Sequence, residues 1–151
     1  MSGGIILSAP GTGNGKTTLT LALLRALRRR GVAIVSAKVG PDYIDPAFHA
    51  AASGADCINL DAWAMRHATL ATLVARLETT SDLVLCEGMM GLFDGAGTAG
   101  DSGSTADLAS LTNWPVVLVV DVSSQAGSAG NPAVARSRRR FSATASGESP
   151  T

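Results

Sequence analysis

The stretch from position 8 to position 18, which reads S-A-P-G-T-G-N-G-K-T-T, constrains the fold more than any other part of the chain. A short apolar run at 5–7 precedes it, and apolar residues at helical spacing follow it over 19–27. A glycine-rich loop between a strand and a helix is the setting of a phosphate-binding loop. The strict pattern G-x-x-x-x-G-K-[ST] would require glycine where the chain has Pro10. Gly-Lys-Thr-Thr directly after a strand still favours phosphate binding over a chance glycine-rich turn.

The chemistry of such a loop assigns roles to its residues. Glycines let backbone N–H groups surround phosphate oxygens, and the first turn of the helix adds its free N–H groups and dipole. We expect Lys16 to reach the β- and γ-phosphates and the Thr17 hydroxyl to ligate Mg²⁺. The chain has ten Arg but only two Lys, Lys16 and Lys38, and a compact ammonium group suits phosphate. The predicted nucleotide-binding residues are Gly11, Thr12, Gly13, Asn14, Gly15, Lys16, Thr17 and Thr18.

The composition is that of a globular chain. Of 151 residues, 46% are hydrophobic and 16% charged, and this length makes one domain the default. A formal net charge of +0 gives no reason to expect a nucleic-acid or membrane partner. The longest strongly apolar run, 116–120, is too short to span a bilayer, and we see no secretory signal. Cys57 and Cys86 lack metal-ligand spacing, so a reducing, cytoplasmic compartment fits best.

Apolar strands alternate with helical patterns along most of the chain. The expected strands are 5–9, 32–39, 83–86 and 115–120, and the expected helices are 15–30, 47–53, 62–77 and 104–111. Continuously apolar strands of this kind indicate an α/β fold, in which helices cover both faces of a parallel sheet. The basic end of the first helix, at 28–30, is interpreted as a solvated helix end.

Two further expectations concern the third helix and the tail. The expected core face of the third helix consists of Trp63, Leu70, Leu73, Val74 and Leu77. Residues 122–151 have few large apolar side chains, a cluster of arginines and seven serines, which predicts disorder. We therefore expect a nucleotide-binding domain over 1–121 and a disordered or aberrant tail over 122–151.

Acidic residues follow the predicted strands. Glu87 ends the strand 83–86, and Asp42 and Asp45 lie on a proline-rich turn after the strand 32–39. Ligands of open parallel sheets bind at the carboxyl ends of the strands, where these acids should meet. Mg²⁺ prefers hard oxygen ligands. The sequence therefore favours Glu87 as the partner of Thr17, with Asp42, Asp45 and the strand-end Asp121 as further candidates.

Four other residues carry side chains that could act in a site. Lys38 is expected near the γ-phosphate, where its charge could stabilise phosphoryl transfer. His49 and His67 lack the spacing of a metal site or a catalytic triad, so both are interpreted as structural or surface residues. Cys86 lies in an apolar strand without a visible base, which argues against a nucleophilic cysteine.

Three stretches together resemble one enzyme family. S-A-P-G-T-G-N-G-K-T-T, K-V-G-P-D-Y-I-D-P-A-F-H and C-E-G-M-M-G-L-F-D-G look like the cobyrinic and hydrogenobyrinic acid a,c-diamide synthases. The resemblance implies a P-loop NTPase-type, dethiobiotin-synthetase-like synthetase domain, followed by a class I glutaminase domain. It also implies a carbon–nitrogen ligase of cobalamin biosynthesis. On this resemblance, MgATP would phosphorylate a corrinoid carboxylate, and ammonia from glutamine would then displace phosphate, first at one of the a and c side chains and then at the other.

The family's roles carry over onto matching positions of this sequence. Thr17, Asp42 (or Asp45) and Glu87 would hold Mg²⁺ beside the nucleotide, and Lys38 would assist transfer. The resemblance places four residues near the corrinoid carboxylate, namely Tyr43, Ile44, Asp45 and Asp94. It implies a corrinoid substrate, an ammonia-supplying glutaminase and, for intact members, a homodimer as one option.

The chain also departs from the family. The glutaminase domain and the later strands of the synthetase domain are not in these 151 residues. We therefore expect an incomplete sheet, low stability and no glutamine-dependent amidation from this chain alone. A shifted reading frame is one hypothesis for the tail. Codons for R-F-S-A-T-A-S-G at 140–147, read two bases along, can give V-L-C-N-R-V-G, which resembles the next family strand.

Three alternatives remain open at the level of sequence. A ParA/MinD-type ATPase switch would carry a second lysine in the loop, at the position that Gly11 occupies here. A dethiobiotin synthetase is disfavoured by the P-D-Y-I-D-P turn at 41–46. The third alternative is an inactive relic that binds nucleotide weakly or not at all.

Overall fold

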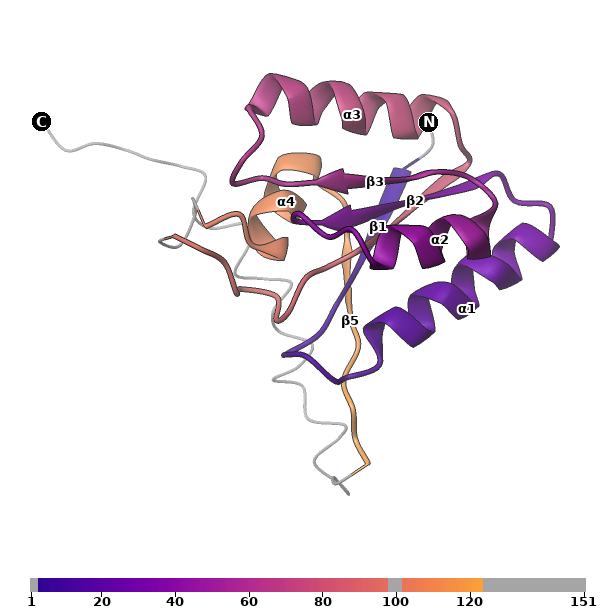
Figure 1. Ribbon diagram of the computed structural model, residues 1–151, viewed down its shortest axis with the longest axis horizontal. Helices are drawn as coiled ribbons and strands as arrows, with labels where there is room; N and C mark the ends of the chain where they lie inside the picture. The colour runs from indigo at the N-terminus through magenta and orange to yellow at the C-terminus, as the bar shows by residue number, and fades with distance from the viewer. Residues whose placement is uncertain (1–2, 98–101, 124–151) are drawn as a thin grey trace, which may run out of the picture. The chain divides into compact units, whose positions relative to one another are not determined.

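The computed structural model describes residues 3–97 and 102–123. Five strands form one sheet in the order β3-β2-β4-β1-β5, and every neighbouring pair is parallel. The strands are β1 (Gly3–Ser8), β2 (Ile34–Val39), β3 (Cys57–Leu60), β4 (Leu83–Glu87) and β5 (Val116–Leu118). The helices are α1 (Lys16–Arg29), α2 (Asp45–Ser53), α3 (His67–Thr79) and α4 (Thr105–Thr112). The predicted α/β fold is confirmed (Figure 1).

Helices cover both faces of the sheet because alternate strand residues point to opposite sides. On one face, Leu24 of α1 packs with strand residues Leu7, Ile34 and Leu85. On the other face, α3 and α4 pack on the second set of strand residues. The buried members of this cluster include Ile6, Ala37, Val39, Val84, Cys86, Leu70, Leu77 and Leu108. The sheet is thus the middle layer of three, as its continuously apolar strands predict.

The edge strand β3 was not predicted from the sequence. It has only four residues, C-I-N-L, and the polar Asn59 interrupts its apolar pattern. Its strand conformation comes from parallel pairing with β2, which places Ser36 opposite Cys57 and Val39 opposite Leu60. A strand this short gains its stability from its neighbour more than from its own sequence.

The third helix begins later than the predicted 62–77. The Asp61 carboxylate accepts hydrogen bonds from the backbone N–H groups of Trp63 and Ala64, each at 3.0 Å, and these bonds form a turn. The helix α3 starts only at His67. Trp63 is 64% exposed, so its assignment to the core face was wrong, whereas Leu70 and Leu77 of that face are buried.

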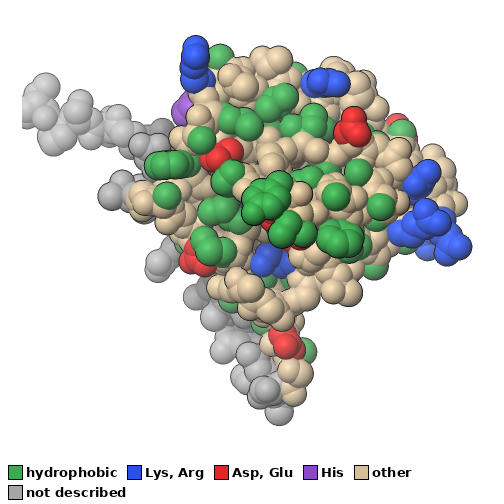
Figure 2. Space-filling model, in the orientation of Figure 1, with side chains coloured by type: hydrophobic (Ala, Val, Ile, Leu, Met, Phe, Trp, Pro, Cys, Tyr) green, Lys and Arg blue, Asp and Glu red, His purple; other side chains and the backbone are tan. Residues whose placement is uncertain are grey.

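The basic end of α1 lies at the surface. Figure 2 shows basic side chains at the end of α1, where Arg28 and Arg29 form an exposed last turn, as expected for a solvated helix end. Among the described residues, no helix is long and apolar enough to cross a membrane.

The chain divides into two units, Met1–Val120 and Asp121–Thr151. Beyond position 123, the predicted disordered tail lies outside the described residues.

The topology brings three loops to the same edge of the sheet. The strand β4 lies between β1 and β2 and is parallel to both, so the carboxyl ends of these three strands lie together. Lys38 near the end of β2 and Glu87 at the end of β4 are register partners. Both alternate with the residues that face α3 and α4, so both side chains lie on the face that α1 and α2 cover.

Candidate functional site

The loop between β1 and α1 has the backbone conformation that its glycines allow. Gly13 has φ 87° and Gly15 has φ 80°, both in the left-handed region that favours glycine. The Asn14 side-chain amide donates to the Gly11 carbonyl at 3.0 Å and closes the loop. Gly15 immediately precedes α1 and has no side chain to cap it, so the first N–H groups of the helix remain suited to an anion.

Lys16 is buried at the start of α1 and bridges to the loop after β4. Its ammonium donates to the carbonyl of Met90 at 2.8 Å and approaches that of Gly11 at 3.5 Å. Burial lowers the pKa of Lys16, against the attraction of Glu87, and the nearby charge of Lys38 lowers it further. Two neutral carbonyls therefore hold this ammonium beside the phosphate loop.

Glu87 is the centre of the hydrogen-bond network at this edge. Its side chain is 1% exposed, and its Oε1 accepts from the Thr17 hydroxyl at 2.6 Å and from Lys38 at 3.3 Å. Its Oε2 lies 2.8 Å from Nε2 of His49. Burial alone would raise the pKa of Glu87, but the bonds from His49 and Thr17 and the charge of Lys38 lower it to about 2. One ionised carboxylate thus connects α1, β2 and α2.

Lys38 is buried between acids from three parts of the chain. Its Nζ lies 2.8 Å from Asp45, 3.3 Å from Glu87 and 3.8 Å from Asp42. Burial opposes the charged form, yet these carboxylates raise the pKa of Lys38 above its ordinary value. The ammonium is therefore charged and fixed in place by its neighbours.

The turn after β2 carries the other predicted residues. Asp42 accepts from the backbone N–H groups of Ile44 at 2.9 Å and Asp45 at 3.1 Å, which shapes the turn. Burial opposes these bonds, but together with Lys38 they lower the pKa of Asp42. Tyr43 is 89% exposed and Ile44 is 59% exposed. The roles predicted for these residues in holding metal and substrate stay predictions.

Two other predicted acids have local roles. Asp94 is exposed on the loop after β4, and its carboxylate accepts from the Gly91 N–H at 2.8 Å. Asp121 belongs to the second unit, where it accepts from the Ser123 N–H at 2.8 Å. The predicted place of Asp94 near the substrate and the candidate role of Asp121 as a metal ligand stay predictions.

His49 belongs to the site, although its spacing led us to interpret it as a structural or surface residue. It is fully buried in α2, with Nε2 on Glu87 and Nδ1 3.5 Å from Sγ of Cys57. Burial lowers the pKa of His49, but the bonds with Cys57 and Glu87 outweigh it and raise the pKa to about 9. The available signal was a helix starting at Asp45, two residues before the predicted start, which places Asp45 and His49 one turn apart.

The Thr17 hydroxyl and the Glu87 carboxylate suit a divalent cation that binds together with a phosphate. They are hard oxygen ligands, and their oxygens already converge at 2.6 Å. Among residues 3–97 and 102–123, no group of three or more His, Cys, Asp and Glu side chains could hold a metal ion by itself. Mg²⁺ commonly keeps several waters and binds through one or two carboxylates plus substrate phosphates, so this donor set fits it.

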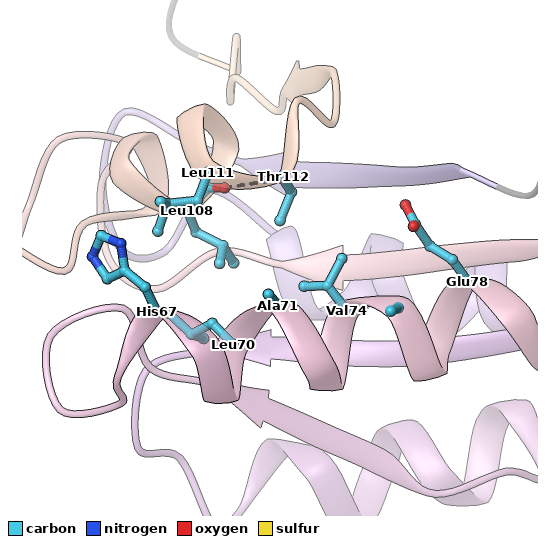
Figure 3. A pocket seen from close by; sticks show the side chains of 9 residues that line it. His67, Leu70, Ala71, Val74, Glu78, Leu108, Leu111 and Thr112 are labelled. Atoms are coloured by element: carbon cyan, nitrogen blue, oxygen red, sulfur yellow. Dashed lines mark hydrogen bonds between the residues drawn. The ribbon is translucent and has the colours of Figure 1, made fainter.

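The other two candidates from the sequence lie on the opposite face. Cys86 is fully buried among core residues, and burial raises the pKa of its thiol, as expected for a structural cysteine. His67 lines a mostly apolar groove of about 350 Å³ between α3 and α4 (Figure 3). In that view Leu108 and Leu111 from α4 face Leu70 and Val74 from α3. This groove is separated by the sheet from the side chains around Glu87.

Comparison with known proteins agrees with this geometry. Residues 5–136 match the family described as the CobQ/CobB/MinD/ParA nucleotide binding domain. The chain belongs to this family. Its phosphate loop and the Thr17–Glu87 pair therefore lie in a nucleotide-binding domain.

The matched relatives narrow the resemblance. The chain is 57% identical over 126 residues to a hydrogenobyrinate a,c-diamide synthase of Brucella anthropi. The matched region covers 83% of this chain and 28% of that protein. The chain is 51% identical over 137 residues to a protein of the same name from Rhodobacter capsulatus, covering 89% of this chain and 31% of that protein. The resemblance inferred from the three motifs is confirmed. The chain spans less than a third of the length of these relatives.

Proposed function

We propose that this chain forms the MgATP-binding part of a hydrogenobyrinate a,c-diamide synthase, a carbon–nitrogen ligase of cobalamin biosynthesis. The observation that carries the proposal is the convergence of Thr17 and Lys38 on Glu87, at 2.6 and 3.3 Å, beside a glycine-rich phosphate loop. The names of the relatives supply the substrate class. A cytoplasmic enzyme fits this biosynthetic role.

The residues of the chain divide the work of phosphoryl transfer. The backbone N–H groups of the loop bind the phosphates, and Lys16 exchanges the Met90 carbonyl for the β- and γ-phosphates. Thr17 and Glu87, with Asp42 as a further candidate, hold Mg²⁺, which neutralises phosphate charge when bound. Lys38, held by Asp45 at 2.8 Å, stabilises charge on the transferred group.

The chemical balance of the proposed reaction is simple. A corrinoid carboxylate oxygen attacks the γ-phosphorus, ADP leaves, and an acyl phosphate forms. Ammonia then attacks the acyl carbon and inorganic phosphate leaves, so that an amide remains. We propose a glutaminase domain of the longer protein as the ammonia source, in line with the resemblance.

The exposed turn after β2 supports the proposal that the substrate is a large organic molecule. Tyr43 and Ile44 present apolar surface beside the half-buried Asp42 and Asp45, and Phe48 one turn into α2 is 56% exposed. Apolar side chains near buried polar groups are typical of sites for large organic ligands. With Asp45 and Asp94, these residues are proposed to receive the corrinoid and its carboxylates.

A binding and turnover experiment on the 151-residue chain tests the proposal. A fluorescent ATP analogue should bind in the presence of Mg²⁺, and Lys16→Ala should weaken binding at least about tenfold, as expected when a charged phosphate contact is lost. Arg29→Ala removes an exposed cation from the other end of α1 and is the matched control, with unchanged affinity.

Turnover separates the synthetase from the other members of the matched family. With ammonium chloride in place of glutamine, hydrogenobyrinic acid should stimulate ADP formation by the chain. A rate of ADP formation that is the same with and without the corrinoid, together with dimerisation in the presence of MgATP, would instead favour an ATPase switch. Absence of nucleotide binding by the unmodified chain would overturn the proposal altogether.

A further inference from the structure

His49 is the one fully buried titratable residue of the Glu87 network to which the proposed function gives no task. It projects from α2, while Thr17 comes from α1 and Lys38 from β2. The two oxygens of the carboxylate have different partners. Oε1 accepts from Thr17 and Lys38, and Oε2 accepts from His49. Because an ionised carboxylate only accepts, Nε2–H of His49 is the donor.

The imidazole ring is itself fixed from two sides. Its Nδ1 lies 3.5 Å from Sγ of Cys57 on the edge strand β3. Its Nε2, on the other side of the ring, lies 2.8 Å from Oε2 of Glu87. The position of Oε2 of Glu87 therefore depends on where α2 and β3 lie, because the ring contacts both Glu87 and Cys57.

A fixed Oε2 determines where Oε1 points. The plane of a carboxylate rotates easily about its last torsion, which has broad preferences. The bond to His49 removes that freedom and keeps Oε1 directed at the Thr17 hydroxyl, 2.6 Å away. Partners that orient a metal ligand in this way typically change metal affinity 10–100-fold when they are removed.

We infer that His49 is a positioning residue of the Mg²⁺-nucleotide site, which holds Oε2 of Glu87 so that Oε1 stays aligned with Thr17. The inference rests on the proposed function, since it assumes that Thr17 and Glu87 receive Mg²⁺ with a nucleotide. It assigns His49 no contact with the substrate and no proton transfer.

The test is a Mg²⁺ titration of the 151-residue chain at a fixed concentration of fluorescent ATP analogue, repeated in EDTA. His49→Leu removes the donor at similar volume and should raise the half-saturating Mg²⁺ concentration about tenfold. Affinity in EDTA should stay within about twofold, because the phosphate loop is untouched. His49→Gln supplies an amide N–H and should recover most of the loss.

A matched control separates positioning from general damage. Trp114→Phe removes another buried ring N–H donor, which bonds Glu78 at 2.8 Å outside the site. It should leave the Mg²⁺ requirement unchanged even if it lowers stability. If His49→Leu does not fold, Cys57→Ala decides, since it frees the other side of the ring and should raise the Mg²⁺ requirement at least about threefold.

The outcomes are distinguishable. An unchanged Mg²⁺ requirement in the deciding variant overturns the inference, and so does an equal loss of affinity with Mg²⁺ and in EDTA. In both cases the proposed function survives if the unmodified chain binds the analogue in a Mg²⁺-dependent way. If the unmodified chain does not bind it, the proposed function and the inference fail together.

Discussion

Replacing Glu87 by Gln should destabilise the metal-free chain by about 3 kcal/mol. The pKa of this carboxyl falls from an ordinary 4.5 to about 2. At about 1.4 kcal/mol for each tenfold change in proton affinity, that difference is worth about 3 kcal/mol. Removing one partner of a buried ion pair costs a similar amount, about 3–5 kcal/mol. The lower end applies here because Lys38 retains Asp45 at 2.8 Å.

The pH dependence of this loss follows from the signs of two pKa shifts. The pKa of Glu87 is depressed, so its stabilisation is present above about pH 4.5 and is lost as the pH falls through about 2. The pKa of His49 is raised from 6.5 to about 9, so its stabilisation is complete below pH 6.5 and is lost as the pH rises through 9. Both shifts include the contact between His49 and Glu87, so the two contributions are not added. The difference between the two proteins should therefore be largest near pH 6.

Urea unfolding followed by circular dichroism, in EDTA at pH 6 and pH 9, measures this difference. The loss should shrink by at least about 1 kcal/mol at pH 9. Glu78→Gln is the matched control, because its amide oxygen can still accept from Trp114, and it should change stability by less than about 0.5 kcal/mol. A loss below about 1 kcal/mol at pH 6, or an equal loss at both pH values, would refute the assignment of Glu87 as the centre of the network.

Two further substitutions test the packing and capping that support the site, both by urea unfolding. A Cβ at Gly4 would overlap the indole ring of Trp114, so Gly4→Ala should cost about 2 kcal/mol, whereas Gly3→Ala has open space and should cost little. Equal effects of the two would contradict this packing. Ser104 caps α4 by accepting a backbone N–H at 3.2 Å, so Ser104→Ala should cost about 1 kcal/mol. Ser110→Ala on the exposed side of the same helix should stay within about 0.5 kcal/mol, and a larger loss there would show that the cap is not the cause.

Local signals in the sequence were sufficient for the phosphate loop and for most elements. Gly13 and Gly15 have the positive φ angles that their positions require, and α1 begins at Lys16, one residue after the predicted start. Glu87 could be chosen because an apolar strand ends there in an acid. The predictions of strands and helices succeed because each depends on neighbouring residues, whose spacing can be read along the sequence.

The features that were missed depend on contacts between distant residues. Trp63 was assigned to a helix core, but Asp61 holds it in a turn before α3. The strand β3 exists through its pairing with β2, and its Cys57 contacts the ring of His49. No periodicity in a single element records such pairings.

The sequence by itself determined a parallel α/β sheet, a glycine-rich loop and the acids at the ends of its strands, because the alternation of apolar strands with helices and the glycines of the loop are short-range patterns. Only the tertiary structure decided which side chains surround Glu87 and how its two carboxylate oxygens are used. Lys38 and His49 lie 49 and 38 residues from Glu87, and they meet it because β2 pairs with β4 in register while α2 packs over the same face. Burial then makes these contacts strong, because the charged groups have exchanged water for one another.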